Sequence, residues 1–402
     1  MKFAVLKETR EGENRVATSP ETIKKIIGMG ASVTVESGAG QGARFDDESY
    51  ALEGATISPS AADAAQGADI ILKVQRPTNE ELRYYPEGAR LIAILSPYND
   101  EESLGSYARL NIDALAMDFM PRITRAQSMD VLSSQSNLAG YKAVIDASAY
   151  FGRAMPMMMT AAGTIAPAKV FVMGAGVAGL QAIATARRLG GVVSATDVRF
   201  AAKEQVESLG ASFVTVDEEA MKNAETEGGY AKEMSQDFQQ RQAEFVAEHI
   251  RKQDIVITTA LIPGRPAPKL VSEDMVRSMK AGSVVVDLAA EQGGNVALTA
   301  AGEAVEADGV TILGFANVPG RLAADASTLY ARNILNFLTA FFDAETQTFN
   351  FDPEDEIIKG VTLTRKGEIV HPNFVSQAPQ VEPAAEQPSD EEPSADITEA
   401  TD

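Results

Sequence analysis

The chain has 402 residues, a formal net charge of −22 at pH 7, and neither cysteine nor tryptophan. Its 45% hydrophobic content is enough for two or more domains with their own cores. The missing cysteines exclude disulfides and thiolate metal sites, and we expect no metal. The acidic balance argues against binding of nucleic acid or of an anionic membrane through a basic surface. We find no signal peptide or transmembrane helix, and so expect no direct membrane insertion.

Short apolar runs alternate with helical patterns over the first 130 residues. Residues 20–28 predict a helix, because Ser19 is a favourable N-cap residue and Pro20 suits the first helical position. A second short helix is expected at 61–67. Strands are predicted at 3–6, 32–35, 70–74, 89–95 and 114–116. Alternation of this kind is typical of a doubly wound parallel sheet.

A cluster of polar side chains precedes a long helical pattern at 130–151. Arg122, Gln127, Asp130 and Ser133 crowd the start of this helix. Asp130 can cap the helix or hold Arg122, while Gln127 and Ser133 can hydrogen-bond an amide and ribose hydroxyls. These groups suit the orientation of a nicotinamide, and none is a strong general base. A capping and ion-pair cluster at a domain junction would show the same pattern.

Residues 168–199 carry a dinucleotide-binding fingerprint. Gly174, Gly176 and Gly179 follow an apolar run at 170–173 with G-x-G-x-x-G spacing, and a helical pattern and a second apolar run at 192–195 come next. Asp197 lies about 20 residues further on, as the fingerprint requires. Gly174 permits a tight turn, Gly176 lets a pyrophosphate approach, and Gly179 lets the helix pack closely on the strand. A glycine-rich turn that binds nothing is the alternative. The expected cofactor-binding residues here are Gly174, Gly176, Val177, Gly179, Asp197, Val198 and Arg199.

The carboxylate of Asp197 favours NAD(H), because it can accept hydrogen bonds from the adenine-ribose hydroxyls and would repel a 2′-phosphate. Arg199 is a counter-indication, since a nearby arginine can reverse the preference. The helix N-terminus after the glycines presents free N–H groups and a positive dipole end to the phosphates.

The rest of the chain completes a second domain and returns to the first. Further strands are predicted at 213–216, 255–258, 284–287 and 310–313, and a helix at 323–342. We therefore expect an α/β fold with two Rossmann-like, doubly wound parallel-sheet domains separated by a cleft. The first would comprise 1–132 and 323–375, and the second, NAD(H)-binding domain would comprise 133–322.

Two segments differ from this pattern. Residues 217–240 are polar and mostly acidic with paired glycines at their middle, and they predict a mobile loop acting as a lid. A solvated helical insertion fits that pattern equally well. Residues 376–402 are rich in Pro, Glu, Ser and Ala without periodicity and predict a disordered acidic tail.

The chain has two histidines, and neither is expected to be catalytic. His249 ends a charged helical stretch, where we expect an exposed side chain, and His371 precedes Pro372 in an expected loop. Dehydrogenases acting on hydroxy or amino acids must move a proton with the hydride and use a His or Lys for it. Arg15 and Lys73 remain candidate substrate-binding cations.

These features together resemble domain I, the NAD(H)-binding component in the alpha subunit, of proton-translocating NAD(P) transhydrogenase. The PRITRAQSMD and GGYAKEMS stretches are specific to that family, and the likeness covers residues 1–340. Other matching stretches are KETREGENRVATSPETIKKI, PMMMTAAGT, FAAKEQVESLG, ITTALIPGRPAP, VVVDLAAEQGGN and NVPGRLAADAS.

The resemblance implies roles for individual residues. Arg122, Gln127, Asp130 and Ser133 would hold the nicotinamide and its ribose, and Asp197 the adenine ribose. Gly229 and Tyr230 would lie in the mobile loop, and Ala260 and Leu261 in the nucleotide pocket.

The resemblance also implies an activity of the Re/Si-specific class. NADH on this chain would pass hydride to NADP⁺ on a partner domain, coupled to proton translocation by a membrane-spanning subunit. The chain would form a homodimer at the cytoplasmic face of the inner membrane. Some family alpha subunits continue into transmembrane helices, so this chain is either a stand-alone subunit or a fragment.

Alanine dehydrogenase is the alternative, since it shares the KE-x-R…GE-x-RVA-x-SP opening and a lysine matching Lys73. That enzyme uses a catalytic histidine on the next strand, where this chain reads Ile94-Leu95-Ser96-Pro97. Transfer between two nicotinamides needs no proton abstraction, so a site without histidine is expected. Catalysis would then be a matter of positioning the two rings.

Overall fold

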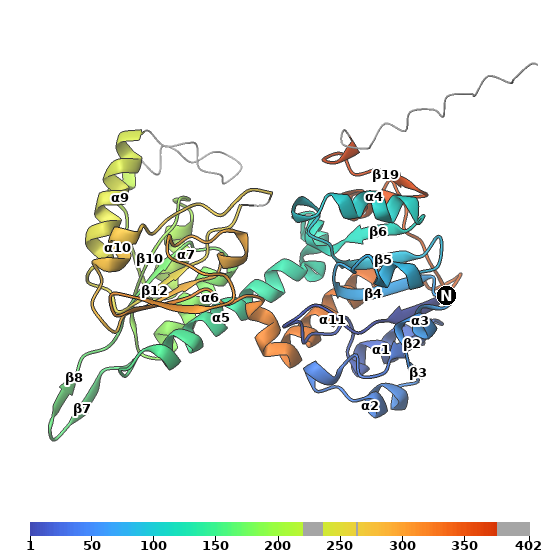
Figure 1. Cartoon of the computed structure of the whole chain (residues 1–402), viewed down its shortest axis with the longest axis horizontal. Helices are drawn as coiled ribbons and strands as arrows, with labels where there is room; N and C mark the ends of the chain where they lie inside the picture. The colour runs from blue at the N-terminus through green and yellow to red at the C-terminus, as the bar shows by residue number, and fades with distance from the viewer. Residues whose placement is uncertain (220–235, 263, 376–402) are drawn as a thin grey trace, which may run out of the picture.

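The computed structural model describes residues 1–219, 236–262 and 264–375. Two mainly parallel sheets with flanking helices lie on either side of two long helices, α5 (Val131–Tyr150) and α11 (Ala323–Ala340), as Figure 1 shows. None of the helices in these ranges is long and apolar enough to cross a membrane.

The first sheet has six parallel strands in the order β3-β2-β1-β4-β5-β6. Its central strands are near-continuous apolar runs, as expected of parallel strands covered on both faces. The strands are β1 (Lys2–Val5), β2 (Ser32–Glu36), β3 (Thr56–Ser58), β4 (Ile70–Gln75), β5 (Arg90–Ile94) and β6 (Asp113–Ala116). The helices that flank this sheet are α1 (Pro20–Gly28), α2 (Asp47–Leu52), α3 (Ala61–Ala65), α4 (Glu102–Arg109) and α12 (Glu356–Val361).

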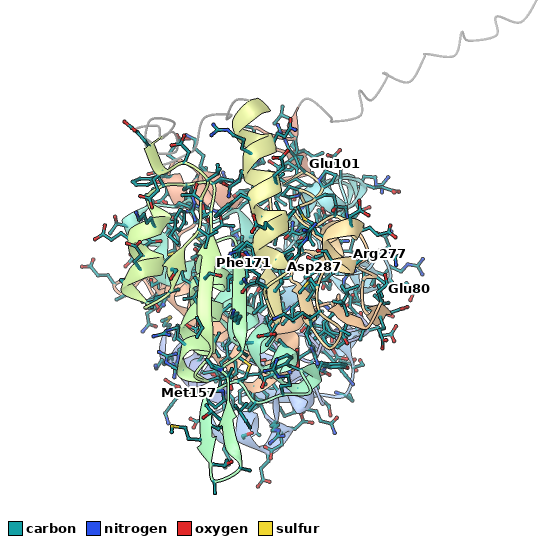
Figure 2. All side chains as sticks on the ribbon, turned by 90° about the vertical axis from the view of Figure 1, so that its left-hand side faces the viewer. Glu80, Glu101, Met157, Phe171, Arg277 and Asp287 are labelled. Atoms are coloured by element: carbon teal, nitrogen blue, oxygen red, sulfur yellow. The ribbon has the colours of Figure 1, made fainter. Side chains whose placement is uncertain are left out.

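The second sheet has seven strands in the order β11-β10-β9-β12-β13-β15-β14, and only β14 is antiparallel to its neighbour. The strands are β9 (Lys169–Met173), β10 (Val192–Thr196), β11 (Ser212–Phe213), β12 (Ile255–Thr258), β13 (Val284–Asp287), β14 (Ala304–Ala307) and β15 (Val310–Leu313). Among the described residues, the helices beside this sheet are α6 (Val177–Arg188), α7 (Ala202–Ser208), α9 (Gln236–Ile250) and α10 (Glu273–Arg277). Figure 2 looks onto this side of the molecule.

Three two-stranded ribbons complete the described strands: β7 (Met158–Thr160) with β8 (Gly163–Ile165), β16 (Phe342–Asp343) with β17 (Thr348–Phe349), and β18 (Thr364–Arg365) with β19 (Glu368–Ile369). The β7–β8 hairpin projects away from the second sheet in Figure 1, and every residue of its two strands is exposed. Met157 lies at its base in Figure 2.

Helices α5 and α11 join the two sheets. Val131 at the start of α5 is buried in the core under the first sheet, whereas Ala143 and Ala147 further along are buried in the core of the second. Helix α11 returns the chain to the first sheet, where its Tyr330 and Phe337 are fully buried. The sequence predicted both helices, and both are confirmed. The boundaries of the two domains stay predictions.

Most predicted elements are present. The helix at 20–28 has the predicted bounds, and Ser19 Oγ accepts a hydrogen bond from the Thr22 N–H at 3.3 Å. Each predicted strand has a counterpart within a few residues. The unpredicted strands are β3, β14 and the hairpin strands, which are short or lie at sheet edges, where burial leaves little pattern. Helix α9 begins at Gln236, inside the segment 217–240 expected as a lid.

Candidate nucleotide-binding site

The three fingerprint glycines meet different surroundings at the end of β9. Gly174 has φ +101°, and a Cβ there would lie 2.5 Å from Thr259 Oγ1. A Cβ on Gly179 would lie 1.8 Å from the carbonyl oxygen of Gly174, so helix α6 packs directly on the turn. At Gly176 a Cβ would meet nothing within 4 Å, so this face of the turn is open to a ligand. The tight turn and the close packing thus occur at the glycines expected for them, and the approach of a pyrophosphate at Gly176 stays a prediction.

The N-terminus of α6 lies where the strand order of the second sheet reverses. Strand β9 pairs with β10 on one side and β12 on the other, and such a switch point is the usual ligand crevice of a doubly wound sheet. Gly176 is the N-cap residue and provides no side-chain cap, and Val177 is 40% exposed. The first N–H groups of α6 are therefore available to an anion.

Asp197, just after β10, connects this turn to Arg199. Its Oδ2 accepts from the Ala175 N–H at 2.7 Å, and its Oδ1 accepts from the Arg199 N–H at 2.9 Å. The Arg199 guanidinium also donates to both carboxylate oxygens, and this pairing raises the arginine pKa. Val198 between them is 74% exposed. The carboxylate is thus held between the glycine turn and Arg199, at the end of β10.

Asn295 fixes the loop after β12. The Asn295 amide accepts from the Ala260 N–H at 3.0 Å and donates to the Ala260 carbonyl at 2.9 Å and to the Pro268 carbonyl at 2.8 Å. Asn295 is fully buried, whereas Leu261 is 47% exposed. Sequence reasoning missed Asn295, because an isolated asparagine in a loop has no distinguishing spacing.

The segment with Arg122 and Gln127 lies between β6 and α5. Both side chains are exposed and hydrogen-bond to none of the described residues. The 3₁₀ helix η5 (Thr124–Met129) is fixed to α11, because the Ser128 carbonyl accepts from Asn333 Nδ2 at 2.8 Å and Asn336 Nδ2 at 3.0 Å. The backbone beside Gln127 is therefore anchored to α11. The anchoring asparagines were also missed from the sequence.

Asp130 caps α5, which decides between the two roles considered for it. Its Oδ1 accepts from the Ser133 N–H at 2.9 Å, and Ser133 Oγ donates to its Oδ2 at 2.6 Å. Within the described residues Asp130 makes no ion pair with Arg122. Both Asp130 and Ser133 are partly exposed. Gly229 and Tyr230 of the expected mobile loop lie outside the described residues.

Arg15, between β1 and α1, and Lys73, on β4, are both buried in ion pairs with glutamates. Arg15 forms a buried ion pair with Glu13 at 2.6 Å and donates to Gln135 Oε1 at 2.8 Å. Lys73 pairs closely with Glu81, and its Nζ lies 3.6 Å from Glu8 Oε2. Burial raises the pKa of Glu8 to about 7. Neither cation is free for a substrate in this arrangement.

The histidines lie in packed surroundings. His249 Nε2 lies 2.8 Å from Ser194 Oγ, and its ring packs edge-on against Phe171, a central residue in Figure 2. The prediction that His249 is exposed is wrong, because α9 packs against the sheet and the His249 side chain is half-buried between them. Burial lowers the pKa of both histidines. His371 is in a loop, as expected, but is buried beside Phe119.

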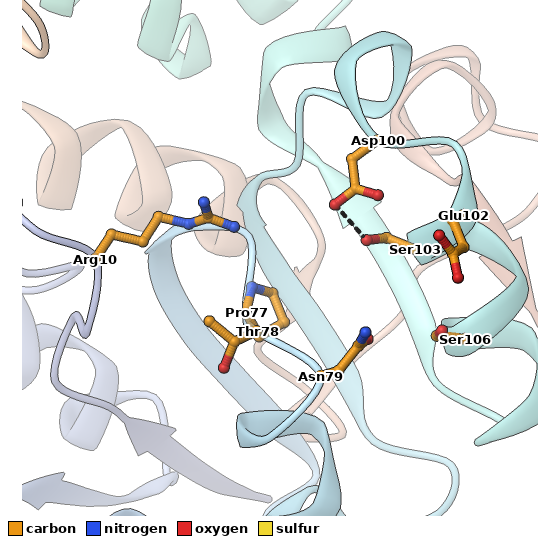
Figure 3. Close-up of a pocket in the computed structure, with 8 residues that line it drawn as sticks. All are labelled: Arg10, Pro77, Thr78, Asn79, Asp100, Glu102, Ser103 and Ser106. Atoms are coloured by element: carbon orange, nitrogen blue, oxygen red, sulfur yellow. Dashed lines mark hydrogen bonds between the residues drawn. The ribbon is translucent and has the colours of Figure 1, made fainter.

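A cleft of about 860 Å³ separates the carboxyl ends of strands in the two sheets, as the predicted architecture requires. Its walls carry three arginines and three glutamates, namely Arg10, Arg76, Arg265, Glu11, Glu13 and Glu291. A smaller hollow of about 210 Å³ lies wholly beside the first sheet, where Ser103 donates to Asp100 (Figure 3). None of the described residues expected at the nucleotide site lines either hollow.

Comparison with known proteins agrees with this architecture. Residues 4–139 match the alanine dehydrogenase/PNT N-terminal domain, and residues 143–372 match the alanine dehydrogenase/PNT C-terminal domain. An NAD(P) transhydrogenase subunit alpha protein of Rhodospirillum rubrum is 56% identical over 382 residues, which cover 94% of this chain and 100% of that protein.

Solved structures extend the comparison. The transhydrogenase crystal structure from Sinorhizobium meliloti has a TM-score of 0.84 at 54% identity, covering 92% of this chain and 100% of that one. An L-alanine dehydrogenase structure has a TM-score of 0.77 at 25% identity, covering 94% and 98%. The family likeness expected from the sequence motifs is confirmed. The chain belongs to the alanine dehydrogenase/PNT family and is a homologue of the transhydrogenase alpha subunit.

Proposed function

We propose that the chain is the NAD(H)-binding alpha component of a Re/Si-specific, proton-translocating NAD(P) transhydrogenase. It would bind NADH and pass hydride to NADP⁺ carried by a partner domain. The observation that carries this proposal is the chemistry around the crevice: a glycine turn, a carboxylate at Asp197, and orienting groups without a proton-transfer residue. The R. rubrum relative is named as part of an NAD(P) transhydrogenase alpha subunit.

The proposed contacts are those expected of the fingerprint and of the family-like segments. The pyrophosphate would meet the first N–H groups of α6, and the adenine ribose would meet Asp197. Ala260 and Leu261 would line the nucleotide pocket, held by Asn295. Arg122, Gln127, Asp130 and Ser133 would orient the nicotinamide and its ribose. Gly229 and Tyr230 would close over the nucleotide.

A hydride donor and a hydride acceptor that are both nicotinamides need no general acid or base. The chain's residues would therefore act by fixing the ring and excluding water, so that the two C4 atoms approach closely. Arg15 and Lys73, which an amino-acid dehydrogenase would offer to its substrate, are buried in ion pairs with glutamates. This favours the transhydrogenase over the alanine dehydrogenase alternative.

The assembly proposed for the chain is a homodimer that docks on NADP(H)-binding and membrane-spanning subunits at the cytoplasmic face of the inner membrane. The β7–β8 hairpin supports the dimer. It exposes Met157, Met159 and Ile165 at 59%, 78% and 41% on a ribbon with no described neighbour on its flanks. A second copy would cover these apolar side chains.

The proposal includes the division into domains 1–132 plus 323–375 and 133–322. This division is supported by the core under the first sheet, which draws on residues 3–131 and 330–361, and by the second core, which spans residues 143–313.

A mixed assay tests the proposed function. The purified chain is combined with an NADP(H)-binding transhydrogenase domain, and reduction of an NADP⁺ analogue by NADH is followed. We expect transfer only in the mixture. Turnover of pyruvate and ammonia by the chain alone would instead establish the dehydrogenase alternative. Absence of both activities, with NADH bound, would indicate a regulatory nucleotide-binding protein.

A further inference from the structure

Helix α5 crosses the first turn of α6 at Gly140, with no room for a side chain. A Cβ built on Gly140 would lie 2.0 Å from the carbonyl oxygen of Ala178, 2.8 Å from its carbonyl carbon and 3.0 Å from its Cα. All three atoms belong to the backbone, so no rotamer change can relieve the overlap. Any larger residue at position 140 must move one helix relative to the other.

The first turn of α6 cannot retreat from such a contact. On its other side Gly179 packs against the Gly174 carbonyl, where an added Cβ would lie at 1.8 Å. The turn is thus held between strand β9 and helix α5. Both helices bury small residues in the core of the second sheet, namely Ala143 and Ala147 of α5 and Ala182 and Ala186 of α6. Close-packed interiors of this kind transmit a displacement rather than absorb it.

Helix α5 also carries groups expected at the nicotinamide. Asp130 caps its N-terminus and Ser133 lies in its first turn, ten and seven residues before Gly140. At about 1.5 Å per residue these groups lie roughly 10–15 Å along the same helix from the crossing. The helix is continuous from Val131 to Tyr150. A displacement at Gly140 is therefore passed to Asp130 and Ser133.

We propose that Gly140 is a positioning residue for hydride transfer. Its missing side chain sets the separation between the turn that would bind the pyrophosphate and the α5 groups that would orient the nicotinamide. The inference rests on the proposed function and extends it to a residue that touches no ligand. Hydride transfer depends steeply on ring placement, since a displacement of about 1 Å can cost on the order of 100-fold in rate.

The substitution Gly140→Ala tests this. Gly105→Ala is the matched control, because Gly105 also lies inside a helix, α4, and a Cβ there would meet nothing within 4 Å. Binding of NADH and of ADP-ribose, which lacks the nicotinamide, is measured together with transfer at saturating NADH in the mixed assay. For Gly140→Ala we expect ADP-ribose affinity within about threefold of wild type and transfer at least tenfold slower. The Gly105→Ala control should match wild type in NADH affinity, ADP-ribose affinity and transfer rate.

Three other results would overturn either the proposed function or the positioning role of Gly140. If wild type itself transfers no hydride, the proposed function fails. If wild type transfers and Gly140→Ala matches it, the positioning role is overturned. Equal losses of ADP-ribose binding and transfer would also overturn it, since they indicate general disruption of the turn.

If Gly140→Ala does not fold, Ala143→Val takes its place, because it adds two methyl groups at a fully buried position of α5 one turn away, and cores tolerate such additions at moderate cost. The proposal is supported if the rate of hydride transfer falls by a factor ten times larger than the factor by which ADP-ribose affinity falls. It is overturned if the two fall equally or if neither falls.

Discussion

Arg199 donates from Nε to Oδ1 of Asp197 at 2.9 Å and from Nη2 to Oδ2 at 3.1 Å. The side chain of Asp197 is 7% exposed and that of Arg199 is 40% exposed. The arginine that could have favoured a 2′-phosphate is thus committed to the carboxylate that would bind the ribose hydroxyls. The pair therefore favours NAD(H) for two reasons. The Asp197 carboxylate would repel a 2′-phosphate, and the Arg199 guanidinium that could bind such a phosphate is already paired with Asp197.

Asp197→Ala should weaken NADH binding by about 10- to 100-fold, because hydrogen bonds to a charged group contribute about 1.5–3 kcal/mol. It also releases the Arg199 guanidinium, so affinity for NADPH should rise through pairing with the 2′-phosphate. Fluorescence titration with both nucleotides measures this. The double variant with Arg199→Ala is the control and should lose the NADPH gain. Unchanged NADH affinity would refute the ribose assignment.

The capping role of Asp130 and the role of its negative charge can be tested separately. Asp130→Asn keeps an oxygen that accepts from the Ser133 N–H, and asparagine is an equally good N-cap, so thermal stability should be unchanged. Asp130→Ala loses the cap, at a cost of about 1 kcal/mol. If the charge orients the nicotinamide ribose, both variants slow transfer. Transfer at the wild-type rate in Asp130→Asn would leave Asp130 with a capping role alone.

Gln127→Asn should slow hydride transfer far more than it weakens NADH binding. The substitution shortens an exposed side chain that hydrogen-bonds to none of the described residues, so stability should not change. It withdraws the amide from the ring and disturbs its placement. Stopped-flow transfer rates and NADH titration give the two quantities. Equal losses in both would count against a positioning role.

Asn295 offers a graded test of the loop that carries Ala260. Asn295→Ala leaves the Ala260 N–H and carbonyl without their partner in a buried position, at about 1–3 kcal/mol for each unsatisfied group. Asn295→Asp keeps an acceptor for the Ala260 N–H, but it replaces the two donated bonds with a buried carboxylate oxygen that faces two carbonyl oxygens. NADH affinity and melting temperature should therefore fall in both variants, and further in Asn295→Asp than in Asn295→Ala. If NADH affinity is unchanged in both variants, the loop that carries Ala260 does not belong to the nucleotide pocket.

The free energy of unfolding should fall as pH rises from about 4.5 to 7, because of the ionisation of Glu8. Burial raises its pKa in the folded chain to about 7 from the usual 4.5, so the folded state binds this proton more tightly than the unfolded state. Above pH 7 the ionised, buried carboxylate lowers the free energy of unfolding by about 3 kcal/mol. Below pH 4.5 both states are protonated and the contribution vanishes.

Glu8→Gln removes this titration. The variant should melt higher than wild type at pH 8 and near the wild-type temperature at pH 4.5, as read by circular dichroism. The exposed residue Glu303 provides the control Glu303→Gln, which should leave the melting temperature close to wild type at both values. A Glu8→Gln advantage that is the same at both pH values would contradict the assignment.

The sequence by itself determined the fold class and the fingerprint. Buried parallel strands are short apolar runs bounded by turns, so β9, β12 and β13 could be located from local pattern alone. The glycine spacing and Asp197 were equally visible, because their geometry arises within one β–α–β unit of adjacent residues. For the remaining candidate site residues, the roles come from the likeness to the family motifs and stay predictions.

Only the tertiary structure decided which contacts those residues make. Arg199 pairs with Asp197, Asn295 holds Ala260, and Gly140 meets Ala178, and no spacing rule predicts any of these. Arg15 and Lys73 were candidate substrate cations until their buried glutamates were located. Their roles depend on side chains brought together by sheet order and helix crossing, and a sequence read one segment at a time contains no distance between them.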